Sequence, residues 1–282
     1  MPRDVARLAA VEPILAEHLK RVNIARFWNY AGQGKDNFAR DRAVVDAIAR
    51  QGFPVLPTLA HDNHRFLLRA AGYLAHEQRI SQFLVLGPGL PADAIYLHDT
   101  VQAFTPSAKV LYVDNDPVVL AHAWHGISSA RCAQVVEADI FDPKSLLDRK
   151  EVTTFLDWSA PIAIICTAAL HYHPGDTADV AGVMQTYIDA AAEGTCTAIS
   201  HFLDPGLEGF DVRGLEAALS TELEVPVQFR TIGQIEELFP DQELLAPGAV
   251  SCVHWPEPDE NAPGAVLTCI AGGIGRKNSS DR

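Results

Sequence analysis

The sequence has no long apolar run and few basic residues. Its longest apolar stretch, residues 162–170, has the length of a strand and falls far below the roughly 20 residues that cross a bilayer. Lys and Arg total 22 against 36 Asp and Glu, which gives a net charge of −14. Binding to a phosphate backbone or to an anionic membrane needs a basic surface. We therefore expect neither a nucleic acid nor a membrane as a partner.

The five cysteines form no Cys-x-x-Cys pair and are odd in number. Three of them lie in apolar, strand-like runs, where a free cysteine behaves as a small hydrophobic residue. The first residues carry Asp4 and Glu12 and lack the apolar centre of a signal peptide. These features favour the reducing cytoplasm.

Three pairs of histidines have short spacings, but no carboxylate lies at a convincing ligand spacing from any of them. We therefore predict no metal site. The pairs are His61 with His64, His122 with His125, and His171 with His173.

What the sequence does contain is typical of a globular protein, with 48% apolar and 21% charged residues. Its 282 residues allow one or two domains. Residues 5–50 have the three- and four-residue spacing of helices, interrupted by a polar loop with two glycines over 28–38. Another helix is expected over 61–77.

From residue 82 the pattern alternates between strands and helices, which indicates a parallel, doubly wound sheet. The expected strands are 82–86, 109–114, 133–138, 160–168 and 196–202. The expected helices are 91–104, with Pro91 in its first turn, 117–126 and 180–192.

A helix over 232–239 precedes two candidate strands, 249–254 and 265–270. The loop between these strands is rich in proline and glycine, so we predict that they are antiparallel. We divide the chain into a helical segment (1–80), an α/β domain (81–277) and a flexible tail (278–282).

In a doubly wound sheet the ligand lies beyond the carboxyl ends of the strands. Three strand ends here are suited to a nucleoside. Gly87-Pro88-Gly89 permits a sharp turn and a close approach to the backbone. Asp114 could accept hydrogen bonds from both ribose hydroxyls, and Asp139 could meet an adenine amino group. The alternative is that these carboxylates cap the helices that follow.

Two ligand classes fit these strand ends. Residues 87–92 match the Gly-x-Gly-x-x-Ala form of the dinucleotide fingerprint, but the acidic residue follows Gly87 by 27 positions instead of about 20. The antiparallel pair near the carboxyl terminus suits instead the seven-stranded sheet of class I S-adenosylmethionine (SAM) methyltransferases.

Several segments resemble one family specifically. They are Val110-Leu-Tyr-Val-Asp-Asn-Asp-Pro-Val-Val-Leu-Ala-His-Ala123, Gly34-Lys-Asp-Asn-Phe38 with Asp41-Arg42, Gln82-Phe-Leu with Gly87, Gly89, Leu90 and Pro91, Phe229-Arg-Thr, Ile235, Pro247-Gly248 and Gly275-Arg-Lys277. In these segments the chain is similar to the actinobacterial SAM-dependent methyltransferases formerly catalogued as a domain of unknown function. The similarity covers about residues 22–277.

The resemblance implies a fold and a cofactor site. The expected fold is a seven-stranded, mostly parallel Rossmann-like sheet with an antiparallel last strand, covered by the amino-terminal helices as a lid. The expected cofactor is SAM or S-adenosylhomocysteine. We expect it to contact Gly87, Pro88, Gly89, Leu90, Asp114, Asn115, Asp139, Ile140, Thr167, Lys35 and Asn37.

The sequence departs from the family at four places. Val85 replaces a usual acidic residue, and Pro88 replaces a small polar residue. Gln33 stands in a Leu-Gly-Gly motif that here reads Gly-Gln-Gly, and Asn63 is followed by His64 where the family usually has arginine. These departures keep open a SAM-binding protein with weak or no catalysis.

Methyl transfer needs alignment of the reactants, and a base only where the acceptor must lose a proton. The candidates are His171 after the fourth strand, His201 in the fifth, and Tyr30 in the polar loop. The alternative is that the histidines satisfy buried backbone groups and that the loop satisfies its own polar groups.

The sequence thus predicts a SAM-dependent methyltransferase that acts on a small molecule. An NAD(P)-dependent oxidoreductase is the remaining alternative. The sequence leaves open the methyl acceptor and the acceptor atom. It also leaves open the oligomeric state, for which a homodimer is one possibility.

Overall fold

The computed structural model describes residues 21–91, 95–127, 132–257 and 269–278. The predicted helix before residue 21, most of the strand predicted at 265–270 and the tail beyond residue 278 lie outside these ranges. No helix in the described ranges is long and apolar enough to cross a membrane.

Five parallel strands form the centre of the sheet. They are β1 (Gln82–Leu86), β2 (Lys109–Asp114), β3 (Ala133–Glu137), β4 (Ala163–Thr167) and β5 (Cys196–Phe202). In the order β3-β2-β1-β4-β5, the strand order reverses between β1 and β4. This reversal is the switch point at which doubly wound sheets bind their ligands.

The last strand, β8 (Ile270–Arg276), lies antiparallel between β5 and β6 (Glu243–Leu244), as predicted for a class I methyltransferase. The short β7 (Val250–Ser251) also pairs with β8, so the sheet has eight strands instead of seven.

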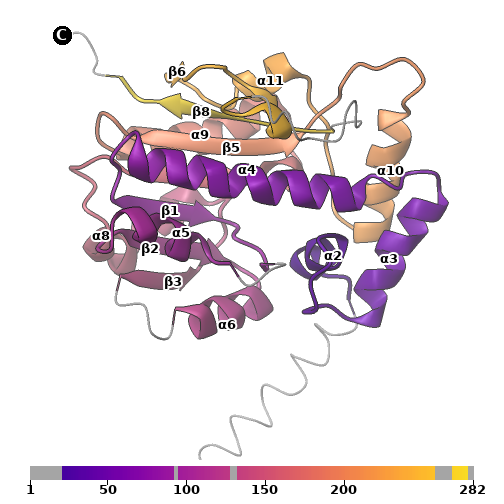
Figure 1. Ribbon diagram of the computed structural model, residues 1–282, viewed down its shortest axis with the longest axis horizontal. Coiled ribbons are helices and arrows are strands. Elements are labelled where there is room, and N and C mark those ends of the chain that lie inside the picture. Colours follow the sequence, from indigo (N-terminus) through magenta and orange to yellow (C-terminus); the bar gives the residue numbers. More distant parts are fainter. Residues whose placement is uncertain (1–20, 92–94, 128–131, 258–268, 279–282) are drawn as a thin grey trace, which may run out of the picture.

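The helices lie on both faces of the sheet. They are α2 (Ile24–Ala31), α3 (Ala39–Arg50), α4 (Leu56–His76), α5 (Leu97–Phe104), α6 (Pro117–Gly126), α7 (Pro143–Leu147), α8 (Lys150–Phe155), α9 (Thr177–Ala190), α10 (Val212–Leu223) and α11 (Ile232–Glu236), with single 3-10 turns η1 (Leu170–Tyr172) and η2 (Cys252–His254). Figure 1 shows α4 lying along the sheet, and α2, α3 and α10 gathered at the carboxyl ends of β1 and β5.

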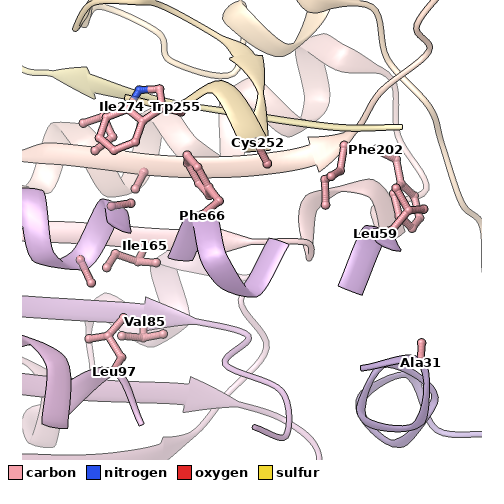
Figure 2. Close-up of a cluster of buried hydrophobic side chains, with 14 of the residues drawn as sticks. Ala31, Leu59, Phe66, Val85, Leu97, Ile165, Phe202, Cys252, Trp255 and Ile274 are labelled. Atoms are coloured by element: carbon pink, nitrogen blue, oxygen red, sulfur yellow. The ribbon is translucent and has the colours of Figure 1, made fainter. Parts of the chain in front are cut away.

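Alternating side chains of the strands supply two apolar cores. Val85, Tyr112 and Ile165 are neighbours across β1, β2 and β4 and face α4, whereas Leu84 and Ile164 face α9. Figure 2 shows the first core, in which side chains of α4 meet those of β5 and β8. Burying one such aliphatic side chain contributes about 1.5–3 kcal/mol, which explains the continuous apolar runs of these strands.

Several element boundaries differ from the sequence prediction. The helix expected at 91–104 begins at Leu97, so Pro91 is not in its first turn. The strand expected at 249–254 ends at Ser251 and continues as η2. The sequence prediction did not include α10.

Lys277, the last residue of the predicted α/β domain, is bonded to neighbouring elements. The Lys277 backbone N–H donates to the Thr195 oxygen at 2.8 Å. The Lys277 ammonium donates to the carbonyl oxygens of Ile188 and Ala191 at 2.9 and 2.8 Å. Lys277 is therefore firmly joined to the end of α9 and the start of β5.

Candidate cofactor and acceptor site

The loop after β1 requires glycine at two positions. Gly87 and Gly89 have φ values of +66° and +63°, a region that disfavours other residues. A Cβ at Gly87 would lie 3.2 Å from the Cβ of Ala169 and 3.5 Å from the Cδ1 of Ile140. The Gly87 N–H donates to the Val113 oxygen at 2.9 Å, which fixes the loop against β2.

Asp114 ends β2 as a partly buried carboxylate beside this loop. Burial raises its pKa to about 6, although backbone N–H groups of Asp116, Gly89 and Asn115 act to lower it. The Asp116 N–H donates to Asp114 Oδ1 at 3.0 Å. An ionised carboxylate here is costly for the folded protein, which is typical of a residue kept for a ligand.

Asp116, two residues after Asp114, caps helix α6. Its Oδ1 accepts from the N–H groups of Val118 and Val119 at 2.7 and 3.2 Å. Its Oδ2 accepts from the side-chain amide of Asn23. Asp116 is therefore held at the start of α6, and Asp114 keeps acceptor capacity toward the cavity beside it.

Helix α2 lies across the strand ends and is tied to the core at further points. The Trp28 indole N–H donates to Tyr172 Oη at 2.7 Å, and the Asn29 Nδ2 donates to the Pro91 oxygen at 3.0 Å. At the base of α2, Arg26 and Asp41 form a buried ion pair with an Nε–Oδ2 distance of 2.7 Å. These contacts hold α2 as a wall of the site.

A cavity of about 460 Å³ lies between this wall, the strand ends and α4. That volume lies within the range of small-ligand sites. The cavity lining includes seven of the predicted cofactor residues: Gly87, Pro88, Gly89, Leu90, Asp114, Asn115 and Thr167.

Asp139 and Ile140 are not among the residues that line the cavity. Asp139 is exposed, and its Oδ1 accepts from the Phe141 N–H at 2.9 Å within the same turn. The Ile140 oxygen accepts from Tyr187 Oη at 2.8 Å, and its side chain lies behind Gly87. Their roles in binding stay predictions.

The polar loop between α2 and α3 satisfies its own polar groups. Asn37 Nδ2 donates to Asn29 Oδ1 and to the Gly34 oxygen, both at 2.9 Å. Lys35 is exposed. Tyr30 lines a second cavity, between α2, α3 and the start of α4. The structure therefore does not bring Tyr30, Lys35 or Asn37 to the first cavity.

His201 is fully buried with a partner on each ring nitrogen. Its Nδ1 is 2.8 Å from the Phe202 oxygen, and its Nε2 is 2.6 Å from Nη1 of Arg230. Because a guanidinium only donates, Nδ1 must carry the proton. Burial and the nearby cation lower the pKa of His201 to about 3. His201 is thus a neutral core residue without a nitrogen free for an acceptor.

His171 is also fully buried and does not line the cavity. Its ring stacks on Phe202 with centroids 3.7 Å apart. Burial, with the nearby Arg230 cation, lowers the pKa of His171 well below its usual value. Neither His171 nor His201, the bases expected from the sequence, lines the cavity in this structure.

Sequence reasoning missed the residues of α4 and of the segments around it that complete the cavity. Asn63 and His64 line it from α4, and Tyr172 lines it from η1. A signal for Asn63 was present, since it interrupts the apolar stripe formed by Leu59 and Phe66. Among the described residues, no group of three or more His, Cys, Asp or Glu is placed to hold a metal ion.

Comparisons with known proteins agree with this geometry. A family model described as S-adenosyl methyltransferase matches residues 16–278. The crystal structure of a protein from Thermobifida fusca is 35% identical, with a TM-score of 0.84 over 92% of this chain and 96% of that chain. A DUF574 family protein from Streptomyces avermitilis is 30% identical, with a TM-score of 0.83 over 92% and 98%.

Comparison with curated proteins finds no match. The family model confirms the resemblance seen in the sequence and decides between the two ligand classes in favour of SAM. The similarity covers the glycine loop, the Asp114 segment and the amino-terminal helices together. The chain belongs to the S-adenosyl methyltransferase family.

Proposed function

We propose that this protein transfers the methyl group of SAM, bound beside the glycine loop and Asp114, to a small molecule bound under α4. One observation carries the proposal. A single cavity joins the glycine loop and Asp114 to the residues of α4 and η1 across the switch point between β1 and β4. Two reactants could therefore meet inside one cavity.

The residues present fit an adenosyl group. The left-handed glycines let a ligand approach the backbone, and the Asp114 carboxylate is suited to ribose hydroxyls. When bound, SAM supplies an electrophilic methyl group on a sulfonium. The protein's own part is to orient the reactants and to exclude water, because α2 covers the strand ends through its contacts with Tyr172 and Asp116.

A small acceptor in the cytoplasm is consistent with the other properties of the chain. The net charge of −14 opposes binding to a polyanion. All five cysteines are free, and four of them are buried, as expected in a reducing compartment.

Calorimetric titration with SAM, S-adenosylhomocysteine and NAD tests the proposal. We expect binding of the two adenosyl ligands and none of NAD. Asp114→Ala should weaken SAM binding at least tenfold, whereas Asp139→Ala tests the adenine contact separately. Release of S-adenosylhomocysteine against a panel of metabolites then separates an enzyme from a binding protein. Failure of both adenosyl ligands to bind would exclude the proposed function.

A further inference from the structure

One end of the cavity is lined by residues other than those predicted to bind the cofactor. This acceptor end is formed by α4, η1, the end of α10 and Trp28 of α2. Its apolar lining is Trp28, Leu67, Tyr172, Leu223 and Val225. Its polar side chains are those of Asn63 and His64, which are consecutive residues of α4.

Among the described residues, the acceptor end so defined contains no Asp, Glu, Lys or Arg. Asp114 and Asp116 line the cavity at β2. Arg21 also lines the cavity. Among the residues that define the acceptor end, a charged acceptor would meet no opposite charge to offset the hydration it loses. The lining favours a neutral, flat ring system between aromatic and branched aliphatic walls.

Hydrogen bonding fixes the direction of the Asn63 amide. The Ala168 N–H donates to Ser200 Oγ at 2.9 Å. Ser200 Oγ donates its one proton to Asn63 Oδ1 at 2.5 Å. The oxygen of Asn63 is therefore engaged at β5, and its NH2 group provides the donors toward the cavity. Such a donor needs an acceptor atom with a lone pair.

His64 adds an imidazole, a side chain that can accept a proton. It lines the same end of the cavity as Asn63, whereas His171 and His201 do not reach it. A donor beside a base is the arrangement that activates an O–H group, since the base removes the proton and the donor stabilises the oxygen that remains.

Resting on the proposed function, we propose that the acceptor is a neutral, planar hydroxyarene that is methylated on oxygen, with Asn63 as its oxygen-binding residue and His64 as its base. The acceptor O–H gives its proton to His64 as the oxygen forms a bond to the methyl carbon. The bond from that carbon to sulfur breaks, and its electron pair stays on sulfur. His64 then releases the proton to water.

The first test measures binding without turnover. We would titrate 2-naphthol, phenol and naphthalene-2-carboxylate into the protein saturated with S-adenosylhomocysteine. We expect 2-naphthol to bind at least tenfold more tightly than the carboxylate of the same ring. Equal binding of the carboxylate, or no binding of either hydroxyarene, would overturn the proposal.

Variants then assign the roles. Asn63→Asp keeps the oxygen that accepts from Ser200 but removes the NH2 donors, so 2-naphthol should bind at least tenfold more weakly. Ser200→Ala, which leaves Asn63 in place but frees its amide, should weaken binding less. His61→Gln, on the exposed side of the same helix, is the matched control. Unchanged binding by Asn63→Asp would contradict the assignment.

The base is tested by separating turnover from binding. His64→Gln should slow methylation of 2-naphthol about 100-fold or more, as loss of a general base does. Binding of 2-naphthol to the protein saturated with S-adenosylhomocysteine should fall much less. An equal loss in turnover and in binding would refute the role of His64. If SAM itself fails to bind, the proposed function fails; if SAM binds and 2-naphthol does not, only the present proposal fails.

Discussion

The ionised form of Asp114 should lower the stability of the folded protein. Burial raises the pKa of this carboxyl from an ordinary 3.8 to about 6. The folded state therefore holds the proton more tightly than the unfolded state. The cost is absent well below pH 4, grows between pH 4 and pH 6, and is complete above pH 6. At pH 7.5 it amounts to about 3 kcal/mol at most, because one pKa unit corresponds to about 1.4 kcal/mol.

Replacement of Asp114 by Asn removes this cost and keeps an oxygen that can accept from the Asp116 N–H. Because water reaches the partly exposed side chain, we expect a gain of about 1–3 kcal/mol in the free energy of unfolding at pH 7.5. At pH 4.5 the gain should be about one third as large. Urea denaturation of both proteins at the two pH values measures the difference.

The same variant should bind SAM roughly 10- to 100-fold more weakly, because charge-assisted hydrogen bonds to the ribose are lost. Higher stability and lower affinity together would identify Asp114 as a residue retained for its ligand. A variant that is no more stable than the wild type at pH 7.5 would refute the reasoning. So would a stability gain that does not depend on pH.

Three further predictions follow from the same contacts. The wild-type affinity for SAM should fall about tenfold between pH 7.5 and pH 5 as Asp114 gains a proton, whereas calorimetry on Asp114→Asn should show a flat profile. Gly87→Ala should lower the free energy of unfolding in urea by about 1–2 kcal/mol, because it combines a positive φ with a contact to Ala169; an unchanged free energy would contradict this. Asp41→Asn removes the buried carboxylate that pairs with Arg26 and should lower the free energy of unfolding in urea by about 3 kcal/mol. A loss below 1 kcal/mol would contradict this prediction.

The central strands could be predicted from the sequence because their residues are buried on both faces. Strands β1, β2 and β5 have the bounds that the sequence predicts. Once these strands were placed, the rule for doubly wound sheets brought Gly87, Asp114 and Thr167 to one edge, and all three line the cavity.

Strand β8 could not be placed because glycine hides its pattern. Gly272 and Gly275 read as turn residues, yet a Cβ at Gly272 would lie 2.6 Å from Phe66 Cζ, and one at Gly275 would lie 2.8 Å from Phe239 Cδ1. These glycines let side chains from other elements pack directly on the strand. That requirement depends on the tertiary structure and leaves no local hydrophobic period to detect.

The polar loop was misleading for a related reason. Polar residues in a glycine-containing segment indicate either a ligand or mutual hydrogen bonding, and spacing alone does not separate the two. In the structure, Asn29 accepts from Asn37 Nδ2 and from the Asp36 N–H, both at 2.9 Å. A Cβ at Gly34 would collide with the Asn29 side chain. The loop composition is therefore explained by Asn29.

Asn63 illustrates where a sequence can still reveal a site. Leu59, Phe66, Ala70 and Leu74 form a buried stripe on α4, and Asn63 falls four residues after the first of them, on the same side of the helix. A polar side chain in such a stripe costs stability unless it has a partner. Ser200 supplies a partner for the oxygen only, so the amide donors remain to be used. The residue that breaks the pattern of its helix is thus a better guide to the proposed acceptor end than His171 and His201, which do not line the cavity.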